Sequence, residues 1–380
     1  MDQAEEFQEQ ATVEAPSKTL TVLNAIGGYL QRKKTGKESF FDKDLGVKWD
    51  TSDQVALSFV KQIEAKFARK NKLFNYFKSG AEIKSLPLAE ELKKLTAEDV
   101  DFSLFADFIL DCLVISATKK SGTSLSDAYV VLVHYKTSFD EGDEGRLLIV
   151  LLDRKGVFNF NNKYEPKNRD SIDLDALKQA AMVDLTLFKE IYPGRNGEAY
   201  LQFVKGNQSS DFFKEALECG SSIENTASVE ALFSALDKFS DEHDLSIALH
   251  NKIQKRVEDK LSEYAKSKSP VSVDYIQGWV DECLADGHQA KGIFSEHVNI
   301  NGYQVNEWTV PTSNSINKAG SFVIEDEKKS YSCKVNKGSV GEYNSNKKVK
   351  LTKDHGYLMI PLSEDEREEI VNRVAENVED

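Results

Sequence analysis

Two apolar runs, DAYVVLVHYK at residues 127–136 and RLLIVLLD at residues 146–153, decide the fold class of this chain. β-Branched and aliphatic residues dominate both runs, and the polar link TSFDEGDEG between them is typical of a turn. Two such runs with a short polar link predict an antiparallel hairpin. We therefore expect a sheet in the first half of the chain, which a third run at 156–160 would extend.

The sequence on either side of this hairpin predicts both helices and strands. Val55, Phe59, Ile63 and Phe67 are spaced four apart, which indicates an amphipathic helix over 53–68 with Thr51, Ser52 or Asp53 as its cap. Before the hairpin we also expect a strand at 18–30, a polar turn at 31–39, and helices at 88–95 and 99–117. After it we expect a short helix at 173–180, strands at 181–188 and 198–205, helices at 226–240, 244–267 and 272–286, five strands between 303 and 361, and a helix at 364–379 capped by Ser363.

This order of elements predicts an α+β fold with two lobes. The N-terminal lobe is expected to be a mixed helix/antiparallel-sheet lobe, and the C-terminal lobe is helix-then-β. We place an acidic disordered tail at 1–17, an α+β domain at 18–222, and a helical and β-hairpin domain at 223–380 that ends in an acidic helix.

The charge of the chain is concentrated at its ends. The 380 residues carry a formal charge of −14, but residues 1–16 hold five acids and no base, and residues 364–380 hold eight acids against two arginines. The body is therefore nearly neutral, and the overall acidity does not exclude nucleic-acid binding. The acidic ends could instead compete with DNA for basic surfaces.

No targeting, membrane or cofactor signal is visible. The four cysteines are far apart, so neither zinc spacing nor a CxxC pair is present. The N-terminus lacks an apolar signal region, and no apolar run approaches the length that spans a bilayer. We expect a cytoplasmic protein with no cofactor, no metal and no membrane partner.

Two lysine-rich stretches are candidates for phosphate contacts. The first, residues 66–78, interleaves Lys66, Arg69, Lys70 and Lys72 with aromatic residues; alternatively, the aromatic residues are core and the bases form a solvated helix end. The second, residues 328–353, holds eight lysines against Glu342 alone. A basic β-ribbon there could follow a nucleic-acid groove, although edge lysines also prevent strand aggregation. Its candidate contacts are Lys334, Lys337, Lys347, Lys348 and Lys350.

A strand–Gly–helix junction at 200–213 is a third candidate. Lys205, Gly206, Ser209 and Ser210 could hold a phosphate at the helix N-terminus, although the same pattern suits an ordinary capped helix. An enzyme is disfavoured because no GxSxG, HExxH or GxGxxG motif occurs. The remaining catalytic alternative is a metal-dependent nuclease that would use Asp127 with Asp153 and Lys155.

The middle of the chain resembles the nucleoid-associated protein NdpA (YejK) family. The resemblance rests on SIDLDALKQAAMVDLTLF (171–188), EAYLQFVKG (198–206) and the Phe212–Phe213 pair, with LNAIGGYL (23–30) and ARKNKLFNYF (68–77) in the expected order. It implies a bacterial DNA-binding protein of the nucleoid without catalytic residues.

The expected function is therefore non-enzymatic, largely sequence-independent binding of double-stranded DNA. The alternative is a protein-interaction module that acts on a DNA enzyme such as a topoisomerase, on a phage or defence protein, or on a second copy of the chain as a homodimer.

Overall fold

The computed structural model describes residues 20–36, 38–80, 88–119, 126–137, 142–153, 160–167, 177–205, 211–326, 328, 330–336 and 339–376. The chain forms two compact units, each of which is described by itself. The first unit contains the residues up to 67 and residues 75–221, and the second contains residues 68–74 and the residues from 222 onward. The combination of one large sheet with helices confirms the α+β fold.

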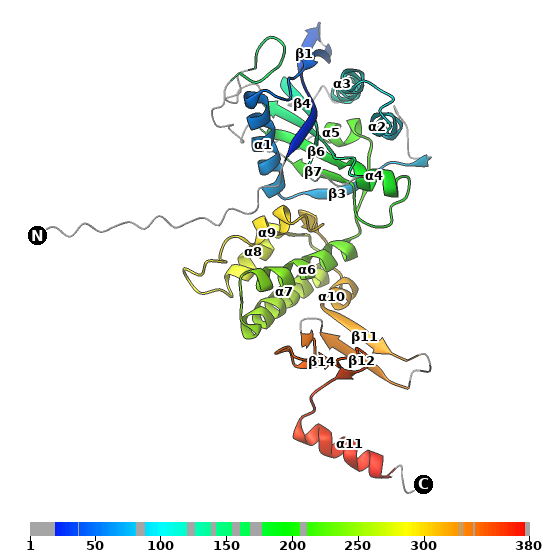
Figure 1. The fold of residues 1–380 in the computed structure, drawn as a ribbon, viewed down its shortest axis with the longest axis vertical. Coiled ribbons are helices and arrows are strands. Elements are labelled where there is room, and N and C mark those ends of the chain that lie inside the picture. The colour runs from blue at the N-terminus through cyan, green and yellow to red at the C-terminus, as the bar shows by residue number, and fades with distance from the viewer. Residues whose placement is uncertain are drawn as a thin grey trace, which may run out of the picture. The chain divides into compact units, whose positions relative to one another are not determined.

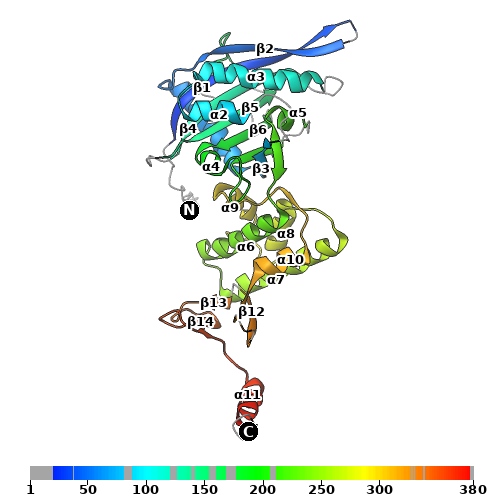
Figure 2. The same ribbon diagram turned by 90° about the vertical axis from the view of Figure 1, so that its right-hand side faces the viewer.

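An eight-stranded sheet dominates the first unit (Figures 1 and 2). Its order is β2-β1-β4-β5-β6-β7-β3-β8, and neighbouring strands from β2 to β7 are antiparallel. The strands are β1 (Thr21–Thr35), β2 (Glu38–Lys48), β3 (Leu73–Phe77), β4 (Ala128–Lys136), β5 (Arg146–Asp153), β6 (Leu177–Asp184), β7 (Leu201–Lys205) and β8 (Cys219–Ser222). The helices are α1 (Gln54–Arg69), α2 (Leu88–Thr96), α3 (Phe102–Lys119), α4 (Leu185–Ile191) and α5 (Phe212–Ala216).

The β4–β5 hairpin confirms the antiparallel pairing predicted from the sequence, with Val131 opposite Val150. Its apolar residues run without alternation because both faces are buried. On one face, Val131 and Val150 pack into a core with Phe59 of α1. Helices α2, α3 and α5 lie on the other side of the sheet (Figure 1). Helix α1 begins where predicted, since the Asp53 carboxylate accepts hydrogen bonds from the first free N–H groups.

Glycines allow segments of the first unit to approach β1 and β2 closely. A Cβ on Gly27 would lie 2.2 Å from the carbonyl oxygen of Tyr164, and a Cβ on Gly46 would lie 2.1 Å from that of Lys163. A Cβ on Gly28 would lie 2.8 Å from a methyl carbon of Leu110 on α3. The backbone of residues 163–164 therefore fits against the sheet only because these side chains are missing.

Two sequence expectations were wrong in the first unit. Residues 31–39 are not a polar turn, because β1 continues to Thr35 and β2 begins at Glu38. Residues 181–188 are not one strand after a helix: β6 begins at Leu177, and α4 begins at Leu185 after its cap Asp184. Residues 179–183, with the sequence QAAMV, form part of strand β6 because they pair with both β5 and β7 in the buried part of the sheet. Most of the strand expected at 156–160 lies outside the described residues.

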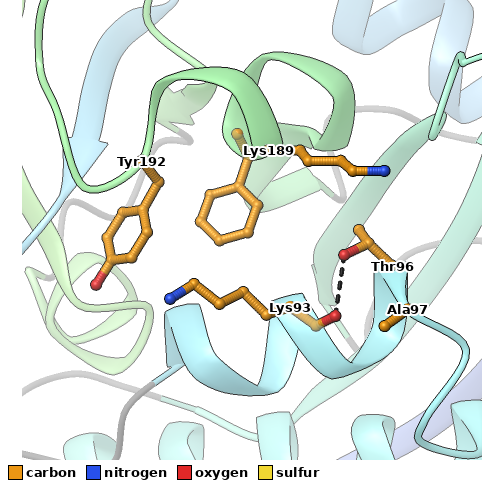
Figure 3. A pocket seen from close by; sticks show the side chains of 6 residues that line it. Lys93, Thr96, Ala97, Lys189 and Tyr192 are labelled. Carbon is orange, nitrogen blue, oxygen red and sulfur yellow. Dashed lines mark hydrogen bonds between the residues drawn. The ribbon is translucent and has the colours of Figure 1, made fainter.

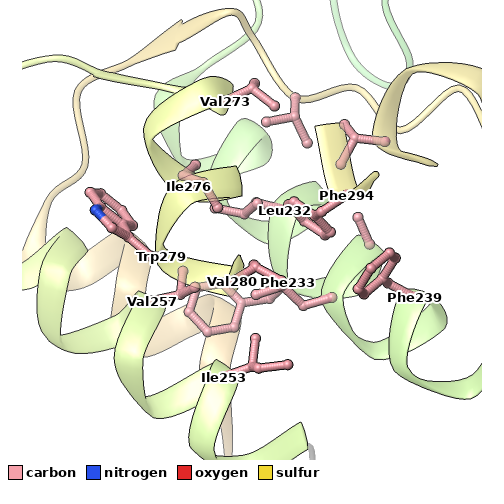
Figure 4. Close-up of a cluster of buried hydrophobic side chains, with 14 of the residues drawn as sticks. Leu232, Phe233, Phe239, Ile253, Val257, Val273, Ile276, Trp279, Val280 and Phe294 are labelled. Carbon is pink, nitrogen blue, oxygen red and sulfur yellow. The ribbon is translucent and has the colours of Figure 1, made fainter. Parts of the chain in front are cut away.

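The second unit is a helical core followed by small sheets. Its elements are α6 (Asn225–Glu242), α7 (Ile247–Ser267), β9 (Val271–Ser272), α8 (Val273–Asp281), α9 (Phe294–Ile300), β10 (Trp308–Thr309), α10 (Ser313–Gly320), β11 (Ser321–Glu325), β12 (Ser332–Asn336), β13 (Val340–Gly341), β14 (Val349–Leu351), β15 (Leu358–Met359) and α11 (Glu364–Glu376). Phe233, Phe239, Val257, Trp279 and Phe294 bury their side chains between these helices (Figure 4).

The three long helices expected after residue 224 correspond to α6, α7 and α8, whereas α9 and α10 were not anticipated. The strand expected at 303–309 is reduced to the two residues of β10. The terminal helix α11 begins after Ser363, whose hydroxyl accepts a hydrogen bond from the backbone N–H of Glu366 at 3.3 Å. The Glu366 carboxylate in turn accepts from the Ser363 N–H, which completes a capping box.

A short segment from the first third of the chain belongs to the second unit. The Asn306 amide oxygen accepts the backbone N–H of Phe74 at 2.9 Å, and the Glu307 N–H donates to the carbonyl of Lys72 at 2.7 Å. The Asn71 amide oxygen accepts from Ser295 and Asn299 at 3.1 and 2.8 Å. Residues 68–74 are thus held by hydrogen bonds to residues far away in the sequence.

We predict that Gly27→Ala lowers the free energy of unfolding by about 1–3 kcal/mol, because the added Cβ has no room beside Tyr164. The matched control is Gly278→Ala within α8, where a Cβ would meet nothing within 4 Å. That control should raise stability by about 0.5–1 kcal/mol. Urea unfolding measures the free energy of unfolding of both variants. Equal changes in the two variants would contradict the inference that the Tyr164 backbone leaves no room for a side chain at Gly27.

Candidate nucleic-acid interface

The C-terminal end of α1 carries the first group of predicted contact residues. Arg69 and Lys70 are exposed, while Lys66 is half-buried. Arg69 already forms an ion pair with Glu296, with its Nε 3.1 Å from the carboxylate. The neighbouring aromatic side chains of Phe67 and Phe74 are buried, so they pack in the interior and do not offer stacking surfaces.

Lys72 must be removed from the predicted contacts. Its side chain is only 3% exposed, and its ammonium donates hydrogen bonds to the carbonyl oxygens of Ala68 and Lys70 at 2.8 and 3.0 Å. These carbonyls lie at and just beyond the end of α1, where a helix has unpaired acceptors and partial negative charge. Lys72 therefore caps the helix and does not face solvent.

The second group of lysines lies in the small sheets of the second unit. Lys334 on β12 is exposed and donates to the Asn317 amide oxygen at 3.1 Å. Lys348 is exposed, and Lys347 and Lys350 are half-buried around β14. The expected single ribbon is instead two sheets, β11–β12 and β13–β14–β15. Lys337 lies outside the described residues.

The charge of the β13–β14 segment remains strongly positive. Residues 339–353 contain four lysines and one acid, Glu342. The Glu342 carboxylate lies 3.2 Å from His355 Nε2, and the Lys353 ammonium lies 5.3 Å from the centre of the Tyr343 ring. This segment offers cations to an anionic ligand with little compensating negative charge.

The strand–Gly–helix junction cannot be described beyond its flanks. Strand β7 ends at Lys205, and the Lys205 side chain, Gly206, Ser209 and Ser210 lie outside the described residues. The flanking side chains of Phe203, Phe212 and Phe213 are buried, with the Phe203 and Phe213 rings 6.1 Å apart. The flanks therefore contribute to the core of the first unit.

A hollow that the sequence did not reveal lies between α2 and α4 in the first unit (Figure 3). Its volume is about 330 Å³, and the rings of Phe188 and Tyr192 line it together with the side chains of Lys93 and Lys189. The Lys93 ammonium lies 5.1 Å from the centre of the Tyr192 ring and 2.9 Å from the Glu90 carboxylate. Lys189 is paired with Glu144.

Burial raises the pKa of the Tyr192 phenol, although the positive charge of Lys93 acts in the opposite direction. Because both ammonium groups have carboxylate partners, the hollow has little excess positive charge to attract anions. No sequence pattern could have found it, since Lys93 and Tyr192 are brought together only by the tertiary fold.

The nuclease alternative gains no support from the described residues. The Asp127 carboxylate accepts hydrogen bonds from the Tyr29 hydroxyl and the Arg32 N–H at 3.0 and 2.8 Å. Lys155 lies outside the described residues. Within the described ranges, no group of three or more His, Cys, Asp and Glu side chains could hold a metal ion. No helix in the same ranges is long and apolar enough to cross a membrane.

The described residues combine an α+β fold with exposed lysines. The family model of the nucleoid-associated protein YejK matches residues 32–339. The chain belongs to this family, as the sequence resemblance indicated. Membership of a nucleoid-associated family agrees with the expected cytoplasmic location at the nucleoid.

Several curated relatives are also described as nucleoid-associated proteins. A nucleoid-associated protein of Pseudomonas putida (strain W619) is 23% identical over 220 residues, which cover 57% of this chain and 62% of the relative. One from Azotobacter vinelandii is 23% identical over 52% of this chain and 56% of its own length. One from Pseudomonas aeruginosa (strain UCBPP-PA14) is 20% identical over 69% of this chain and 75% of its own. The chain thus spans about three fifths of the length of the first relatives it matches.

We predict opposite outcomes for two neighbouring lysines. Lys72→Met should lower the free energy of unfolding by about 1–3 kcal/mol, because the carbonyls of Ala68 and Lys70 lose a donor. Lys70→Met, at an exposed position, should leave stability within about 0.5 kcal/mol of the parent chain. Chemical unfolding measures both, and an unchanged Lys72→Met variant would show that the capping assignment is wrong.

Proposed function

We propose that this protein binds double-stranded DNA through phosphate contacts, largely independently of base sequence and without catalysis. The observation that carries the proposal is the excess of lysine over acid in residues 339–353 of a chain that belongs to a nucleoid-associated family. Lysines that neutralise phosphates release counterions, which gives affinity without reading bases.

The proposed contacts fall in two groups of cations. Lys334, Lys347, Lys348 and Lys350 supply the first, and Lys66, Arg69 and Lys70 at the end of α1 supply the second. Lys337 and the junction formed by Lys205, Gly206, Ser209 and Ser210 remain auxiliary candidates. Lys72 is excluded because its ammonium is bound to backbone carbonyls.

The test is a salt titration of binding to duplexes of unrelated sequence. The double variant Lys347→Ala/Lys350→Ala should weaken binding to every duplex alike and reduce the slope of log K against log salt by about 1.8, since each phosphate contact contributes about 0.9. Lys238→Ala on α6 is the matched control, because Lys238 is exposed but lies outside the lysine-rich segment. Its slope should equal that of the parent chain.

Binding that does not respond to salt, or that is absent at about 50 mM salt, would refute the proposal. A strong preference for one duplex would refute its sequence independence, since phosphates carry no direct base information.

A second candidate, docking of a protein partner, is favoured by α11. The side chains of Ile370, Val371 and Val374 on this helix are 47%, 60% and 57% exposed to solvent. Apolar side chains that gather on one helix are usually covered by another surface, so their exposure favours a protein partner. A stoichiometric partner that survives nuclease treatment and is lost in Ile370→Asp/Val374→Asp would support it. Retention of that partner by the double variant would exclude α11 as the contact.

A further inference from the structure

The hairpin of β1 and β2 continues beyond the sheet as a two-stranded ribbon. Strand β1 pairs with both β2 and β4 as far as Leu30, whose partner Ala128 is the first residue of β4. From residue 31 onward β1 pairs with β2 alone. Figure 2 shows this end of the hairpin reaching past the other strands of the sheet. We call the paired residues 31–35 and 38–42 the ribbon.

The ribbon is fixed to the first unit at its base and exposed toward its end. The backbone N–H of Phe41 donates to the Thr118 hydroxyl of α3 at 3.0 Å, and the N–H of Arg32 donates to the Asp127 carboxylate at 2.8 Å. Beyond this base, residues 33–36 are exposed. Three residues of a strand extend about 10 Å, which matches the depth of the DNA major groove, about 8.5 Å.

The cations of the ribbon lie on both of its faces. Residues 31–36 hold Arg32, Lys33 and Lys34 and no acid. The Arg32 guanidinium donates to Ser39 at 3.1 Å on one face, and the Lys33 ammonium pairs with Asp42 on the other. Lys34 shares the face of Arg32, because side chains alternate along a strand. Cations on two faces suit a space with an anionic wall on each side, such as a groove of duplex DNA.

The acidic side chains of the ribbon leave its cations available to phosphate. Its second strand carries Glu38 and Asp42. The Lys33 and Asp42 side chains are 44% and 49% exposed, and an exposed ion pair contributes little free energy, so a phosphate can replace the carboxylate. Lys119, exposed at the end of α3 next to Thr118, adds a further cation beside the base of the ribbon.

We propose that the ribbon enters the major groove of double-stranded DNA, where Lys33 and Lys34 contact phosphates on opposite sides. The major groove is about 12 Å wide and admits a two-stranded β-ribbon, whose strands lie about 4.8 Å apart. The minor groove, about 6 Å wide, leaves no room for side chains on both faces of such a ribbon. The ribbon lies outside both groups of cations assigned above, and its role rests on the proposed function because DNA is its ligand.

The double variant Lys33→Ala/Lys34→Ala tests the phosphate contacts in the full chain. Its binding to duplex DNA should lose about 1.8 from the slope of log K against log salt, since each phosphate contact contributes about 0.9. The matched control, Lys94→Ala/Lys238→Ala, removes two exposed lysines of α2 and α6 and should keep the parent slope. Equal slopes for the ribbon variant and this control would overturn the proposal.

Dimethyl sulfate footprinting identifies the groove that the ribbon occupies. The reagent methylates guanine N7, which faces the major groove, and adenine N3, which faces the minor groove. The parent chain should protect guanine N7 at the site it covers. At saturating concentration Lys33→Ala/Lys34→Ala should lose this protection, whereas Lys347→Ala/Lys350→Ala should keep it. Guanine N7 protection by the ribbon variant, or protection of adenine N3 by the parent, would contradict insertion into the major groove.

Asp42→Asn removes the carboxylate that competes with phosphate for Lys33. The variant should bind duplex DNA about 1.5- to 5-fold more tightly at low salt, which corresponds to the energy of an exposed ion pair. Glu90→Gln is the matched control, because it removes the same charge from an exposed pair with Lys93 on α2 and should leave the affinity unchanged. An equal gain in both variants would show a general charge effect and refute the role of Lys33.

The ribbon and the proposed function fail in different ways. Absence of duplex binding by the parent chain at about 50 mM salt would overturn both. A salt slope that falls in Lys347→Ala/Lys350→Ala but not in Lys33→Ala/Lys34→Ala would overturn the ribbon alone and leave DNA binding in place. Parent-like DNA binding by the ribbon variant, together with loss of a protein partner that survives nuclease treatment, would assign the ribbon to an acidic protein instead.

Discussion

Burial of the β4–β5 hairpin on both faces is the constraint on which the first unit depends. Strands whose apolar residues run without alternation must be covered on both faces, or they expose apolar surface to water. Helix α1 packs on one face of the sheet through Phe59 and its neighbours, and helices α2, α3 and α5 lie on the other side (Figure 1). At Gly27 and Gly28 of β1, the absence of a side chain lets the backbone of Tyr164 and the side chain of Leu110 approach the sheet closely.

The elements with strong local patterns could be predicted, and those stabilised by distant partners could not. Helix α1 carries apolar residues four apart, and the hairpin at 127–153 consists of two continuous apolar runs joined by a polar link. Strand β2 has neither pattern, since charged residues interrupt it and its pairing with β1 is what stabilises it. Residues 177–180, which were expected in a short helix, belong to β6, because β5 and β7 on either side hold this strand in the sheet.

For the candidate site, the sequence predicts where positive charge is concentrated but not which side chains the fold turns inward. A sequence reveals where lysines are concentrated, and Lys348 and Lys353 of the second lysine-rich stretch are exposed. It cannot reveal that the Lys72 ammonium is bound to two carbonyls, because that depends on how the chain turns after α1.

The segment 68–74 has a consequence for how the protein can be divided. It runs from the end of α1 to the start of β3, and it forms hydrogen bonds with Ser295, Asn299 and Asn306 of the second unit. Neither unit is therefore a continuous stretch of polypeptide. A gene fragment that begins near residue 222 would encode the second unit without this segment and leave those polar groups unpaired. Cleavage of the chain at a single point therefore cannot release the second unit complete.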